Sequence, residues 1–206
     1  MKKTHYQKYK ITSQWGISMT AAQAAEVTID SLTYKTAAKG IVYVSNCTNN
    51  LEGEIAIPST VTIKGEKYNV PFIGKQAFDG CSLLTNVIIP DSVTSIGDTA
   101  FYRCSSLTSV IIGNSVSSIG ETAFMSCASL TSITIPNSVI KIGDFTFRNC
   151  TSLKKVYFQS KTPPEVGSSI FSKCPSDMII YYPAGAEQNW INKWHEFSIA
   201  PWNPIK

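Results

Sequence analysis

The feature that most constrains this chain is an internal repeat of 23 residues. Four copies of the segment I-G-x-x-A/T-F-x-x-C start at residues 73, 96, 119 and 142, and a partial fifth contains Phe171 and Cys174. One unit of this size cannot bury its own apolar face, so neighbouring units must stack. The repeat therefore predicts a solenoid, in which each unit contacts the units before and after it.

Each full unit reads I-G-x-x-A-F-x-x-C-x-x-L-x-x-V-x-I-P-x-S-V-x-x. The V-x-I alternation has the period of two that indicates a strand with one face inward. The stretch from Gly to Leu has the spacing of a helical or 3₁₀ turn. One strand and one turn in roughly 20–29 residues is the plan of a leucine-rich repeat solenoid. We therefore expect a parallel β-sheet on one face and short helical or 3₁₀ turns on the other. The phenylalanines are expected to stack beneath the turns: Phe78, Phe101, Phe124, Phe147 and Phe171.

The consensus I-G-x-x-A-F-x-x-C-x-S-L-x-x-[VI]-x-I-P resembles the BspA-like class of leucine-rich repeats of bacterial surface proteins. The repeats cover residues 73–183, as four full units and a partial fifth, and residues 26–72 resemble an N-terminal β cap with a hairpin. Strands are expected at residues 32–35 and 40–44, and the hairpin at 62–70. The resemblance implies a secreted or cell-surface protein that adheres to host extracellular-matrix proteins or to other cells.

The two ends of the chain depart from the repeat. Residues 184–206 predict a C-terminal helical cap, with Trp190, Ile191, Trp194 and Phe197 on one helical face. A solenoid must cover its last unit, which favours a cap over an exposed aromatic contact site. Residues 1–25 resemble a degenerate secretory signal with a basic start and a small-residue stretch, but they lack a continuous apolar core. A polar segment without a targeting role is the alternative, and both stay open.

Charge and hydropathy exclude two classes of partner. Four of the 18 Lys and Arg residues lie in the first 25 residues, which contain no acid. The other 14 are balanced by 14 Asp and Glu, so the repeats lack the basic surface that nucleic-acid binding needs. No stretch approaches the ~20 apolar residues of a membrane-spanning helix. We therefore expect neither nucleic-acid binding nor membrane insertion.

The sequence predicts no catalytic site, metal or cofactor. Five of the six cysteines occupy one repeat position: Cys81, Cys104, Cys127, Cys150 and Cys174. Stacked side chains with parallel Cα–Cβ bonds are poorly placed for disulfides, so buried free thiols are expected, with Cys47 lacking a partner. A linear column cannot bring four thiolates around one zinc ion. The two histidines, His5 and His195, lie outside the repeats, so no histidine-based relay is predicted there.

The candidate binding surface consists of the residues between the inward positions of each strand, which point out from the sheet. We call these residues the outward row: Ile88, Ile111, Thr134, Tyr157 and Tyr181. Lys155 lies in the adjoining column. Aligned apolar and aromatic side chains make a contiguous patch of the kind enriched at protein contacts. β-propensity alone could also have selected these residues. The sequence thus favours a non-enzymatic protein-binding module, and a structural spacer of the cell envelope is the alternative.

Overall fold

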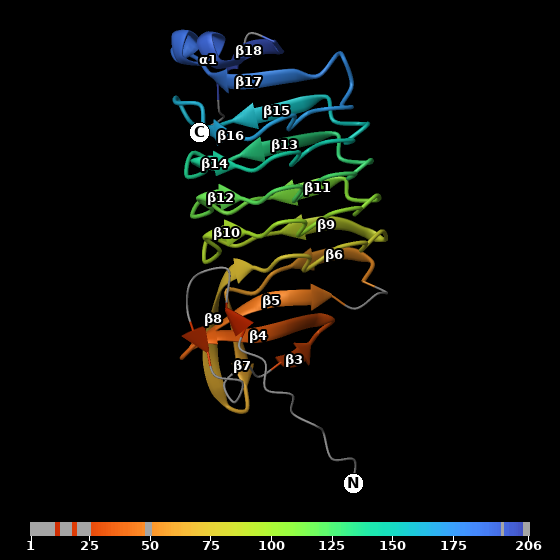
Figure 1. The fold of residues 1–206 in the computed structure, drawn as a ribbon, viewed down its shortest axis with the longest axis vertical. Helices are drawn as coiled ribbons and strands as arrows, with labels where there is room; N and C mark the ends of the chain where they lie inside the picture. The colour runs from red at the N-terminus through yellow and green to blue at the C-terminus, as the bar shows by residue number, and fades with distance from the viewer. Residues whose placement is uncertain (1–10, 13–17, 20–25, 48–50, 195, 204–206) are drawn as a thin grey trace.

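The structure is a computed structural model that describes residues 11–12, 18–19, 26–47, 51–194 and 196–203. Strands β1 (Ile11–Thr12) and β2 (Ser18–Met19) pair antiparallel. The remainder of the expected leader segment, residues 1–25, lies outside the described residues. Figure 1 shows the chain rising from a group of N-terminal strands, through stacked repeat units, to a helix at the C-terminal end.

The N-terminal strands form the base of the stack. Strands β3 (Glu26–Ile29), β4 (Leu32–Ala38) and β5 (Ile41–Cys47) are an antiparallel meander. Strands β7 (Thr60–Ile63) and β8 (Glu66–Ile73) form a hairpin. The strands expected at residues 32–35 and 40–44 are therefore present, as is the hairpin. Strand β8 pairs in parallel with β5, and this joins the meander to the repeats.

Each repeat unit contributes strands to two walls, of which the sequence analysis predicted one. The V-x-I strands make the predicted wall: β6 (Gly53–Ala56), β9 (Leu84–Ile88), β11 (Ser109–Ile111), β13 (Ser132–Ile135), β15 (Lys155–Phe158) and β17 (Ile179–Pro183). They pair in parallel, but the pairing is interrupted between β11 and β13. The second wall extends from β8 through two-residue parallel strands: β10 (Ser95–Ile96), β12 (Ser118–Ile119), β14 (Lys141–Ile142) and β16 (Glu165–Val166).

The third wall consists of β-turns, whereas the sequence spacing suggested helical or 3₁₀ turns. Backbone N–H groups donate to the carbonyl three residues earlier at Ala77 (3.3 Å), Asp79 (3.1 Å) and Cys81 (3.1 Å). The intervening residues Gln76 and Gly80 have φ angles of 60° and 73°. A right-handed helix needs φ near −63°, so these two positions stop a helix from forming. The same alternation recurs in the following units.

The core is filled by columns of identical side chains. The five predicted phenylalanines stack with ring centroids 4.8–5.6 Å apart and interplanar angles of at most 16°, as expected. The inward residues of the V-x-I strands are buried as well. At the corner after each two-residue strand, glycine permits a close approach between units. A Cβ on Gly120 would lie 2.5 Å from the Asp98 backbone nitrogen.

The C-terminal helix α1 (Glu187–Trp194) covers the last unit. Trp190 and Trp194 are buried, and their rings lie 4.8 and 5.6 Å from the Phe158 ring. The expectation that Ile191 shares this face was wrong, because Ile191 is 47% exposed. Phe197 is 36% exposed, but its ring packs against Trp194 and Phe171, 5.7 Å from each. Ile191 adjoins Trp190 and so points about 100° away from it, while Phe197 follows the end of the helix. An unpredicted strand, β18 (Ser198–Trp202), pairs in parallel with β17.

Four of the five cysteines in the column are free thiols. Cys47 and Cys81 form a disulfide, so the expectations that Cys81 is a free thiol and that Cys47 lacks a partner were both wrong. Cys81 is the first cysteine of the column, and its neighbour on that side is the end of β5. Parallel Cα–Cβ bonds disfavour a disulfide only between cysteines of stacked repeat units, and Cys47 lies outside these units. The remaining four cysteines are free thiols: Cys104, Cys127, Cys150 and the half-buried Cys174.

Candidate functional site

The residues of the outward row lie opposite one another, as the repeat register requires. They form two blocks, because the ladder is interrupted between β11 and β13. Ile88 lies opposite Ile111 in the ladder of β9 and β11. Tyr157 lies opposite both Thr134 and Tyr181 in the ladders of β13, β15 and β17. Ile111 is the most exposed member at 57%, and the other four are half-buried.

The aromatic end of this face is larger than the sequence analysis predicted. The rings of Tyr157 and Tyr181 stack with centroids 4.7 Å apart and planes inclined by 15°. Trp202, which was not among the candidates, packs against Tyr157 at 4.9 Å. Its indole N–H donates to the Phe158 carbonyl at 3.1 Å, which fixes the ring. The S-I-A-P-W segment that forms β18 was the available signal, since Ile199 and Trp202 are its apolar members.

Positive charge beside the aromatic cluster comes from two lysines with different surroundings. Lys154 Nζ lies 3.1 Å from a carboxylate oxygen of Asp177, and both side chains are more than 60% exposed. An exposed pair of this kind contributes little to stability, but it does neutralise the local charge. Lys155, opposite Ser132 and Ile179 in the ladder, is also exposed. It supplies the net positive charge next to Tyr157.

A groove of about 530 Å³ lies where the ladder is interrupted between β11 and β13. Ile111 and Thr134 of the outward row line it, together with the side chains of Asn114 and Gln159. The groove reaches toward the core, because Ile112 is 7% exposed whereas the equivalent residues of neighbouring units are exposed by at most 1%. None of the described lining residues has an ionisable side chain.

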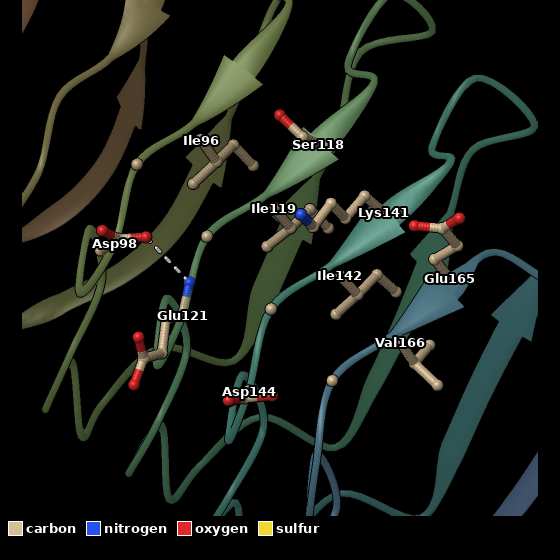
Figure 2. A pocket seen from close by; sticks show the side chains of 14 residues that line it. Ile96, Asp98, Ser118, Ile119, Glu121, Lys141, Ile142, Asp144, Glu165 and Val166 are labelled. Atoms are coloured by element: carbon tan, nitrogen blue, oxygen red, sulfur yellow. Dashed lines mark hydrogen bonds between the residues drawn. The ribbon is translucent and has the colours of Figure 1, made fainter. Parts of the chain in front are cut away.

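A second groove, of about 570 Å³, runs along the wall of two-residue strands (Figure 2). Figure 2 shows Ser118, Lys141 and Glu165 along one side and a row of acids along the other: Asp98, Glu121 and Asp144. Two of these acids hydrogen-bond to the backbone of the next unit. Asp98 Oδ1 accepts the Glu121 N–H at 3.0 Å, and Asp144 Oδ1 accepts the Ser168 N–H at 2.6 Å.

The acidic row therefore helps to hold successive units together at this corner. Side-chain oxygens that accept backbone N–H groups stabilise turns in this way. Within the described part of the chain, no group of three or more His, Cys, Asp or Glu side chains is placed to hold a metal ion. The two histidines lie outside the described residues.

The free cysteines have the surroundings of structural residues. Each thiol donates to the carbonyl of a phenylalanine in the preceding unit, for example Cys104 to Phe78 at 3.1 Å. Burial raises the pKa of Cys104 to about 12 and that of the half-buried Cys174 to about 11. Burial also raises the pKa values of Cys127 and Cys150. Because the thiolate is the nucleophilic form, these thiols are poor nucleophiles at neutral pH.

Comparison with known sequences agrees with this architecture. The sequence profile of the BspA type leucine rich repeat region matches residues 71–188 in six copies. A search of curated proteins finds no match. No helix among the described residues is long and apolar enough to span a membrane.

Several solved bacterial structures are similar. A leucine-rich repeat protein from Bacteroides capillosus is 37% identical with a TM-score of 0.60, over 65% of this chain and 98% of that one. A leucine-rich cell surface protein from Faecalibacterium prausnitzii is 32% identical with a TM-score of 0.62, over 77% of this chain and 45% of that one. A leucine-rich repeat protein from T. pallidum is 28% identical with a TM-score of 0.66, over 76% and 71% of the two chains.

Proposed function

Because the chain belongs to the family of BspA-type leucine-rich repeat proteins, we propose that it is a non-enzymatic bacterial protein of the cell surface or secreted space. In this proposal it binds another protein through the face that carries the outward row. A host extracellular-matrix or cell-surface protein is the proposed partner. The observation that carries the proposal is the aromatic and aliphatic surface on that face, formed by the cluster of Tyr157, Tyr181 and Trp202, with exposed Ile111 on the far side of the groove.

The composition of this surface supports binding over a spacer role. Tyr157, Tyr181 and Trp202 pack together, and Lys155 is exposed beside them. Tyr and Trp are enriched at protein contacts, whereas a spacer needs only small polar residues facing solvent. Ile111 extends the apolar surface toward the middle of the stack and is 57% exposed.

The disulfide between Cys47 and Cys81 supports the proposed location. Structural disulfides form and persist in oxidising compartments outside the cytosol. One of the similar solved structures is that of a cell surface protein. Both points favour secretion or surface display of this chain.

The test is a pull-down of the folded protein against extracellular-matrix proteins and cell-surface extracts. A partner captured by the parent protein should bind the double variant Tyr157→Ser, Tyr181→Ser at least about tenfold more weakly, because aromatic anchors dominate such interfaces. Tyr102→Ser, on the turn wall, is the matched control and should bind as the parent does. Unchanged affinity in the double variant would move the site to another face. Capture of no protein at all would favour the spacer.

A further inference from the structure

The interrupted ladder between β11 and β13 leaves open backbone in the middle of the proposed binding face. In the preceding unit, Ile89 donates its N–H to the Ile111 carbonyl at 2.9 Å. In the following unit, the Gln159 N–H donates to the Ile135 carbonyl at 3.0 Å. Among the described backbone hydrogen bonds, Ile112 makes neither equivalent contact to β13. Its peptide groups lie at the groove.

Pro136 removes one hydrogen bond at this unit. The carbonyl of Ile112 would accept a hydrogen bond from residue 136, but Pro136 has no N–H to donate. Proline alone does not open the ladder, because Pro90 stands at the same position where β6 and β9 remain paired. At the next residue, a Cβ on Gly113 would lie 2.5 Å from the Pro90 carbonyl oxygen, so this corner packs closely on the preceding unit.

The outward row has a notch at the same place. Thr134 is a small side chain between Ile111 and Tyr157, which stand two strand spacings apart, or about 10 Å. Tyr181 stacks on one face of the Tyr157 ring. The register places Thr134 on the other side of that ring, and Trp202 also packs against the ring at 4.9 Å. An apolar side chain entering the notch would contact Ile111 and Thr134, which both line the groove.

We propose that this groove binds an extended peptide segment of the partner protein, without charged side chains, that inserts one aliphatic or aromatic side chain beside Ile111 and over Thr134. This inference rests on the proposed function and specifies its ligand. Backbone N–H and C=O groups without a partner in the ladder can hydrogen-bond the main chain of an extended peptide that lies along the groove. The side-chain amides of Asn114 and Gln159 line the groove and can bind further peptide groups. A charged segment would be desolvated there without a counter-charge.

The test uses a phage-displayed library of random linear peptides, selected on the folded full chain. Enriched sequences should be uncharged over a short stretch that contains one large apolar residue. A synthetic peptide from this set should bind Ile111→Arg at least about tenfold more weakly than the parent, as expected when a central contact is lost. Ile140→Arg is the matched control, because Ile140 is 67% exposed but lies outside the groove. Its affinity should stay within about twofold of the parent value.

Hydrogen exchange distinguishes a bound peptide backbone from other ligands in the groove. Addition of the peptide should slow exchange of the Ile112 amide, because a paired peptide backbone protects the strand edge. Enrichment of charged peptides, equal binding by Ile111→Arg and the parent, or unchanged exchange at Ile112 would each overturn the inference. So would a neutral oligosaccharide that binds the parent and competes with the peptide.

The outcome distinguishes this inference from the broader function. A captured partner that depends on Tyr157 and Tyr181 but tolerates Ile111→Arg would leave the binding function intact and remove the groove as its site. A partner that tolerates all three substitutions would contradict both.

Discussion

The stacked phenylalanine column is one of the apolar columns that connect the repeat units, and Phe124→Ala tests it at the centre. The Phe124 side chain is fully buried, and its ring lies between Phe101 at 5.1 Å and Phe147 at 5.5 Å. Truncation leaves a cavity bordered by both neighbouring units. Since each unit is held by its neighbours, the loss affects the connection in both directions.

The expected cost follows from burial and stacking. Replacing a buried Phe by Ala costs about 3–5 kcal/mol, and each aromatic stack is worth about 0.5–1.5 kcal/mol beyond its buried area. The range for Phe→Ala already includes such contacts, and the loss of two stacks at Phe124 places the expected cost in its upper part, at about 4–5 kcal/mol. For a chain of this size, 1 kcal/mol changes Tm by about 2–4 °C. The melting temperature should therefore fall by roughly 8–20 °C.

Urea denaturation and thermal melting, both followed by circular dichroism, measure the effect. Phe145→Ala is the control, because Phe145 is only partly buried and its ring lies 5.4 Å from the Arg148 guanidinium. That variant should lose no more than about 1 kcal/mol. If Phe124→Ala costs less than about 1 kcal/mol, or no more than Phe145→Ala, the column does not hold the units together.

Three further predictions concern the disulfide, the thiols and the glycine corner. The disulfide between Cys47 and Cys81 links residues 34 positions apart. Its reduction should lower the free energy of unfolding by roughly 4 kcal/mol. An unchanged urea midpoint in reductant would contradict this. Thiol ionisation should leave stability unchanged below pH 9 and lower it between about pH 9 and 12, because burial raises the pKa of Cys104 from 9.0 to about 12 and the unfolded thiol loses its proton first. Cys104→Ala should lessen this alkaline fall in the urea midpoint, and an equal fall would be the contrary result. Gly120→Ala should destabilise the protein by about 1–3 kcal/mol, because the new Cβ would meet backbone of the preceding unit. The Cβ of Gly80→Ala meets no atom within 4 Å, so this control should cost only about 1–2 kcal/mol of backbone strain. Melting curves in which Gly80→Ala is the less stable variant would refute the close-approach argument.

Features that repeat with the period could be predicted from the sequence. A 23-residue spacing fixes which side chains stack, so the phenylalanine column and the outward row follow from register alone. The wall of two-residue strands was missed, because strands such as Ser95–Ile96 are too short to show alternation. The helical turns were expected from spacing, but spacing does not reveal the positive φ angles at Gln76 and Gly80.

Features outside the period depended on tertiary position. Cys47 has no repeat register, so its approach to Cys81 is set by how β5 meets the first turn. Trp202 reaches the proposed binding face because β18 adds a strand beside β17. The interruption between β11 and β13 could not be predicted, because Pro136 removes only one hydrogen bond and Pro90 stands at the same position in a ladder that stays paired.

The claim that this face is the binding surface is tested most directly by hydrogen exchange on the complex with a captured partner. The account predicts that binding slows amide exchange along β11, β13, β15 and β17. The turn wall around Phe101 and the two-residue strands β10, β12 and β14 should exchange as in the free protein. Slower exchange confined to the turn wall or to the acidic groove beside Glu121, with no change along β11 to β17, would contradict the account.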